Sequence, residues 1–135
     1  CLMKILLRLI STSILVSTCI GLFSAAAIAQ SGENGAALKT IAGIVASLNH
    51  FPSDADKATL SEIAGNDDLA QGVRAMARTV SNISHSANDQ GKAAMARIQE
   101  NAQAPDYAKQ LAGIIAGINH TASDAEKATL AELFQ

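Results

Sequence analysis

Apolar residues recur every three or four positions in several short stretches of this chain, which is the spacing of an amphipathic helix. In the first of these stretches the apolar positions are Leu38, Ile41, Ala42, Val45 and Leu48. The pattern predicts six helices. Their expected bounds are 36–48, 54–64, 68–84, 89–102, 105–118 and 124–134. No stretch alternates between apolar and polar residues while being rich in β-branched ones, so we expect no sheet.

Residues suited to starting and ending helices stand between these stretches. Ser53, Asn88 and Ser123 each precede the second helix of a pair, where their side-chain oxygens can accept from free N–H groups of the first turn. Asn49 can end the first helix in a left-handed conformation. Pro52 then prevents the helix from continuing. The chain is therefore expected to consist of helix–turn–helix units.

One such unit occurs three times along the chain. Residues 38–63 match residues 108–133 at 15 of 26 positions, and a weaker copy lies halfway between them. One hairpin cannot bury its apolar face alone, whereas three hairpins together share a continuous core. We predict an all-α domain at 36–135. Its three tandem helix–turn–helix repeats of roughly 35 residues should span about 36–66, 67–103 and 104–135, as a small α-solenoid or a six-helix bundle.

The N-terminal stretch has the pattern of a secretory signal peptide. Lys4 and Arg8 precede an apolar run, and Ala27 and Ala29 form a small-x-small cleavage motif. We expect a signal peptide at 1–29, with Met3 as the true start, and a flexible lead-in at 30–35. A transmembrane anchor is the alternative, but Ser and Thr dilute the run. The expected protein is periplasmic or secreted by bacterial-type export, with no stable membrane span after cleavage.

Composition narrows the possible functions. A chain with 49% hydrophobic and 16% charged residues suits one small domain. Both cysteines precede the expected cleavage site, so the mature protein would contain no disulfide and no cysteine ligand. The mature charge would be about −4, without a basic stripe. Because nucleic-acid binding depends on clustered Lys and Arg, we expect no nucleic-acid partner.

The three histidines of the chain, His50, His85 and His120, are 35 residues apart and end the first helix of each repeat. We favour a structural role, in which each imidazole bonds free carbonyl groups at the negative end of the helix dipole. The alternative is that the three bind a metal ion or haem. The aspartates four residues further on would then fix the tautomer of each ring. Phe51 and Phe134 look like local hydrophobic plugs.

Few features of the sequence indicate an enzyme. No serine lies in a nucleophile-elbow pattern, and no glycine-rich loop could cradle a phosphate. We therefore expect an exported, non-enzymatic helical-repeat protein without a cofactor, which binds a protein or peptide along the surface of its repeats. The alternative is a periplasmic protein that binds a transition metal or haem through His50, His85 and His120.

Overall fold

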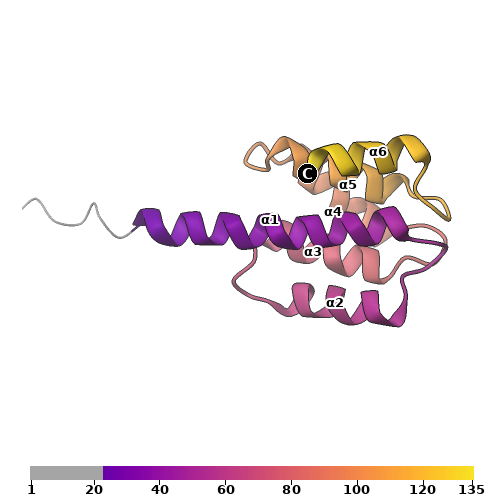
Figure 1. Ribbon diagram of the computed structural model, residues 1–135, viewed down its shortest axis with the longest axis horizontal. Coiled ribbons are helices and arrows are strands. Elements are labelled where there is room, and N and C mark those ends of the chain that lie inside the picture. Colours follow the sequence, from indigo (N-terminus) through magenta and orange to yellow (C-terminus); the bar gives the residue numbers. More distant parts are fainter. Residues whose placement is uncertain (1–22) are drawn as a thin grey trace, which may run out of the picture.

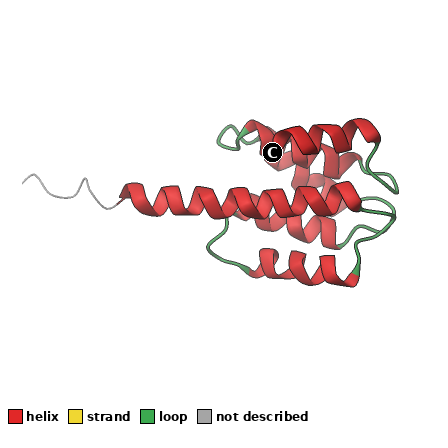
Figure 2. Ribbon diagram, viewed as in Figure 1, coloured by secondary structure: helices red, strands yellow, loops and turns green. Residues whose placement is uncertain are grey.

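The computed structural model describes residues 23–135, which form six α-helices and no strand (Figures 1 and 2). The prediction of an all-α fold is confirmed. The helices are α1 (Phe23–Ser47), α2 (Asp54–Gly65), α3 (Gln71–Ser81), α4 (Asp89–Glu100), α5 (Asp106–Gly117) and α6 (Asp124–Leu133).

The predicted capping residues begin the second helix of each repeat. Ser53 accepts from the backbone N–H of Asp56, and Ser123 accepts from that of Glu126. In both cases the acidic side chain accepts from the capping residue in return, which satisfies two free donors at once. Asn88 accepts from the N–H of Gly91. The three helices therefore start at equivalent positions for the same reason.

The first helix is longer than expected. Residues 30–35 were predicted to be a flexible lead-in, but they are helical and belong to α1. Alanine has the highest helix propensity, and residues 24–29 are rich in it. Asn34 also accepts from the N–H of Ala70, which joins α1 to the start of α3. Most of the expected signal peptide, residues 1–22, lies outside the described residues, and none of the described helices is both long and apolar enough to span a membrane.

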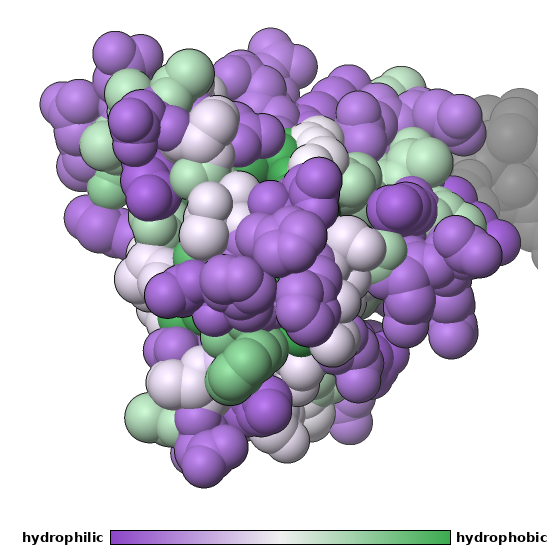
Figure 3. Space-filling model, turned by 90° about the vertical axis from the view of Figure 1, so that its right-hand side faces the viewer, coloured by the Kyte–Doolittle hydropathy of each residue, from purple (hydrophilic) through white to green (hydrophobic). Residues whose placement is uncertain are grey.

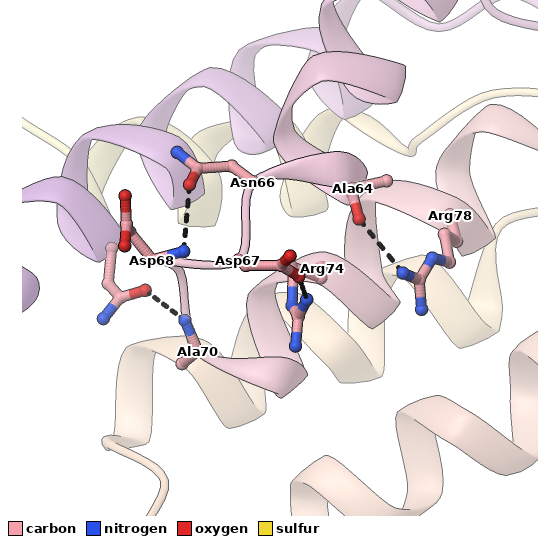
Figure 4. Close-up of polar contacts among 8 residues, drawn as sticks. Ala64, Asn66, Asp67, Asp68, Ala70, Arg74 and Arg78 are labelled. Carbon is pink, nitrogen blue, oxygen red and sulfur yellow. Dashed lines mark hydrogen bonds and ion pairs between the residues drawn. The ribbon is translucent and has the colours of Figure 1, made fainter.

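The third helix is shorter than expected, because a turn takes up its predicted first residues. Asn66 accepts from the N–H of Asp68, which closes this turn after α2 (Figure 4). Arg74 forms an ion pair with Asp67, and Arg78 donates to the carbonyl of Ala64. Both arginines thus hold the connector against α3.

The helices close into a bundle instead of an open solenoid. The first helices of the repeats, α1, α3 and α5, all contact one another. Each second helix packs against the first helix of the following repeat: α2 on α3, α4 on α5 and, closing the circle, α6 on α1. The second helices make no contacts with one another in the described part of the chain. The result is an approximate three-fold arrangement with one shared interior.

The interior is built from equivalent residues of the three repeats. One layer is Ile41, Met76 and Leu111, and the next is Val45, Val80 and Ile115. Every side chain in these two layers is at most 1% exposed. Leu60, Met95 and Leu130 add the matching residues of the second helices. Burial of each large apolar side chain contributes about 1.5–3 kcal/mol, so gathering these equivalent side chains in one interior stabilises the closed bundle.

Candidate functional site: the histidine triangle

The loops inside the three repeats meet at one end of the bundle, which is the right-hand end in Figure 1 and faces the viewer in Figure 3. His50, His85 and His120 occupy the same place in each loop, and their backbones form a closed ring of hydrogen bonds. The N–H of His50 donates to the carbonyl of His120 at 2.7 Å. The N–H of His85 donates to His50 at 2.7 Å, and that of His120 to His85 at 2.5 Å. We call these three residues the histidine triangle.

The backbone of each histidine is in the left-handed region, with φ of 68° at His50 and 71° at His85 and His120. The N–H of Phe51 donates to the carbonyl of Asn49 at 2.8 Å, across His50, and Thr121 bonds Asn119 in the same way. A three-residue turn of this kind with positive φ is rare and strained. The prediction that Asn49 adopts the left-handed conformation is therefore wrong, because His50 does so.

The side chains of the histidine triangle lie close together in solvent. All three residues are exposed. The ring centres of His50 and His85 are 5.4 Å apart, and His120 lies 5.1 Å from each of them. The ring planes meet at 88°, 88° and 78°, so each pair is edge to face. The sequence predicted the spacing of these residues along the chain, and the fold brings all three together.

The preceding asparagine, and not the following aspartate, is the partner of the imidazole. Nδ1 of His50 lies 2.5 Å from Oδ1 of Asn49. Nδ1 of His120 lies 2.7 Å from Oδ1 of Asn119. Among the described residues, these are the hydrogen bonds of the triangle's rings, and none goes to a helix carbonyl or to an aspartate. The structural role of the histidines therefore comes from their backbone, and the rings are left for other contacts.

The rings do not present a ready metal site in the orientation that they adopt. Between residues 23 and 135, no group of three His, Cys, Asp or Glu side chains is arranged to hold a metal ion. What the triangle does provide is three imidazoles within reach of one point, on a backbone fixed by its own hydrogen bonds. The candidate chemistry is thus ligand binding by nitrogen donors after the rings turn.

One apolar side chain stands beside the triangle. Phe51 is 59% exposed, and Nζ of Lys57 lies 6.0 Å from its ring centre. The prediction that Phe51 is a local plug is wrong, since it is Pro52 that is buried at this point. Phe134 instead packs edge to face on Tyr107 with ring centres 5.9 Å apart. These two line a shallow cleft at the opposite end of the bundle, next to Lys39.

Comparison with known proteins assigns no family to this fold. No family model, no curated protein and no solved structure matches the chain. The features of the molecule that bear on function are the histidine triangle and its surroundings.

Proposed function

We propose that this chain is an exported, non-enzymatic binding protein whose ligand is a transition-metal ion held by His50, His85 and His120. One observation supports the proposal above all others. Three exposed imidazoles, one from each repeat, have ring centres between 5.1 and 5.4 Å apart. A zinc ion bound by three imidazole nitrogens at about 2.0–2.1 Å in tetrahedral geometry holds the ring centres roughly 5 Å apart. The separation of the rings therefore fits without movement of the backbone.

The rings have to turn before three nitrogens can face one ion, because they lie edge to face. The terminal torsion of histidine has broad energy wells, so the torsional cost of this rotation is small. The rotation also gives up the exposed contacts of His50 with Asn49 and of His120 with Asn119. Exposed side chains change rotamer within picoseconds to nanoseconds. The backbone hydrogen bonds between the three histidines keep the loops in place meanwhile. Side-chain rotation alone would assemble the site.

The donor set favours particular metals. Imidazole nitrogen suits Zn²⁺, Cu²⁺ and Ni²⁺, whereas Mg²⁺ and Ca²⁺ prefer oxygen ligands. Three protein ligands on a tetrahedral ion leave one position for water or an exogenous ligand. Haem fits less well, since it needs a flat apolar slot and the triangle's immediate neighbours include the polar Asn49 and Asn119. We therefore prefer a metal ion to haem.

Titration calorimetry of the purified chain with Zn²⁺, Cu²⁺ and Ni²⁺ tests this function. The parent is expected to bind one ion, and a variant with His50, His85 and His120 all changed to Asn is expected to bind at least tenfold more weakly. Asn is the suitable replacement because it tolerates the left-handed backbone. Equal affinity of parent and triple variant would exclude the triangle as the metal site.

A matched control replaces a second set of exposed residues that the repeats also share. Asp54, Asp89 and Asp124 begin the second helices and are exposed. Changing all three to Asn removes three carboxylates but leaves every imidazole in place. Metal affinity should stay within about fivefold of the parent, because loss of exposed charges changes binding by only a few tenths of a kcal/mol to 1 kcal/mol.

Binding of a protein or peptide is the second candidate, and the exposure of Phe51 favours it. Large aromatic side chains often anchor interfaces, and Phe51 stands 59% exposed at the loop end. The equivalent residues of the other repeats, Ser86 and Thr121, are polar. Peptides selected from a displayed library against this chain should lose affinity for a Phe51→Ser variant. Peptides that bind both proteins equally would count against an interface at Phe51.

Export is supported by the charged start, apolar run and small-residue end of residues 1–29. A tagged copy of the chain expressed in a two-membrane bacterium is expected in the periplasmic fraction, shortened after Ala29. A copy that begins at Gln30 should stay in the cytoplasm. Recovery of the full-length chain in the cytoplasm with its N-terminus intact would contradict export.

A further inference from the structure

We propose that α6 is a latch, which opens by leaving α1 as a unit while the other described helices stay folded. The bundle has three seams, at which a second helix packs on the first helix of the next repeat: α2 on α3, α4 on α5 and α6 on α1. Residues 66–70 and 101–105 connect the helices of the first two seams. The chain does not run directly from α6 to α1, because these are the last and the first helix of the described residues (Figure 1).

Side chains also hold the first two seams together. Nη2 of Arg78, on α3, donates to the carbonyl of Ala64, on α2, at 3.0 Å. The equivalent residues of the second seam are Gly113, on α5, and Gln99, on α4. A Cβ atom at Gly113 would lie 3.6 Å from Oε1 of Gln99. In both seams, residues at the same two positions of the repeat therefore meet across the interface.

The third seam lacks this contact. The residues at the two positions are Gly43, on α1, and Phe134, directly after α6. A Cβ atom at Gly43 would have no atom of another helix within 4 Å. The ring of Phe134 packs instead on Tyr107 of its own repeat. The side-chain hydrogen bonds described for α6 all stay within residues 123–129, so none of them joins this helix to α1.

A cleft of about 240 Å³ lies at the same seam, lined by Lys39 of α1 and by Leu133 and Phe134 at the end of α6. Atoms that line such a gap lose the contacts that close packing would give them. At 10 residues α6 is also the shortest described helix, and Leu130 is its one buried residue. Local opening costs least where buried contacts are few. Opening of α6 gives access from one side to the interior next to Leu130, without unfolding of the other repeats.

α2 provides an internal reference, because its sequence nearly repeats that of α6. Both helices begin with a serine capping box, and each buries one leucine, Leu60 in α2 and Leu130 in α6. Their intrinsic helix stability is therefore similar, and a difference in opening reports the seam. A helix this short is not stable alone in water, so α6 loses its internal hydrogen bonds when it leaves α1. Its backbone amides then exchange hydrogen with the solvent.

Native-state hydrogen exchange compares the amides of residues 128–133 with their equivalents at 58–63. Those of α6 should exchange at least about tenfold faster than those of α2, and at one common rate. Their exchange should depend less on urea than global unfolding does, because opening exposes only the surface under α6. Rates that rise gradually towards Leu133 would indicate fraying of a helix end and contradict a latch. Equal exchange of the two helices, or exchange of α6 only by global unfolding, would also overturn the inference.

Gly43→Arg gives the third seam the side chain that Arg78 provides in the first. It should slow the exchange of α6 about three- to tenfold, the effect of one hydrogen bond, and leave α2 unchanged. Gly43→Ala is the matched control, because it also replaces the glycine in α1 but cannot reach α6; its α6 should exchange as in the parent. Arg78→Ala should speed the exchange of α2 by a similar factor. If Gly43→Arg and Gly43→Ala do not differ, contacts across the seam do not govern the opening of α6 and the latch is refuted.

Discussion

The left-handed backbone of the histidine triangle leads to a prediction about which side chains position 50 tolerates. His50 has φ of 68°, is exposed, and forms its backbone contacts through N–H and C=O groups that any residue except proline possesses. Changing it to Gly, Ala or Val therefore alters backbone strain with little change in packing. The expected order of stability is Gly, then the parent, then Ala, then Val.

The size of the effect follows from the backbone. A residue with a Cβ atom loses about 1–2 kcal/mol in the left-handed region, and glycine avoids this penalty. Glycine also gives the unfolded chain more freedom, which costs about 0.4–1 kcal/mol. The net gain for His50→Gly is thus about 0.5–1 kcal/mol. His50→Val should lose about 1–2 kcal/mol, because a β-branched residue is an outlier at positive φ.

Urea unfolding followed by circular dichroism measures these differences. With a slope of about 1–3 kcal/mol per molar urea, a change of 1 kcal/mol moves the midpoint by roughly 0.3–1 M. At an exposed position with ordinary φ the Gly variant would be less stable than the Ala variant, since glycine destabilises a regular backbone by about 0.5–1 kcal/mol relative to alanine. A Gly variant less stable than the Ala variant would refute the left-handed assignment and the strain derived from it.

Two other predictions concern the caps and the core. Ser123→Ala should lower the free energy of unfolding by about 1 kcal/mol through loss of the capping bond to Glu126, as measured by urea unfolding. Gly91→Ala should lower it by about 1–3 kcal/mol, because the new Cβ would lie 2.7 Å from Cγ2 of Thr79; adding Thr79→Ser should restore part of the loss in a double-mutant cycle.

The sequence predicts the helices because their signals are local. The caps Ser53, Asn88 and Ser123 act within one turn, and the apolar spacing is complete within each helix. Closure of the bundle depends on contacts between repeats, about which periodicity says nothing. The periodicity of apolar residues shows that a face of α2 is apolar, but it does not show that this face meets α3 of the next repeat. The same pattern therefore allowed both a solenoid and a bundle.

The candidate site was predictable only in part. The 35-residue spacing identified the three histidines, but the assignment of the left-handed residue fell on Asn49, because asparagine and glycine are the usual residues at that position. The hydrogen bonds that link His50, His85 and His120 join residues 35 or 70 positions apart, and no local signal indicates them. The contact between adjacent Asn49 and His50 is local, yet it depends on a turn that hydrogen bonds to the other repeats help to hold in place.

The strained turns support the proposal that the side chain of histidine matters and not only its backbone. Glycine would adopt the same φ at lower cost, so the turn itself does not require an imidazole. The middle repeat differs from the first on both sides of the histidine, with Ser84 in place of Asn49 and Ser86 in place of Phe51, yet His85 occupies the position. Strained backbone in a folded protein tends to occur at functional sites, where the surrounding structure holds it. Three rings kept at one exposed end, each at a cost in stability, are what the proposed ligand of all three histidines would account for.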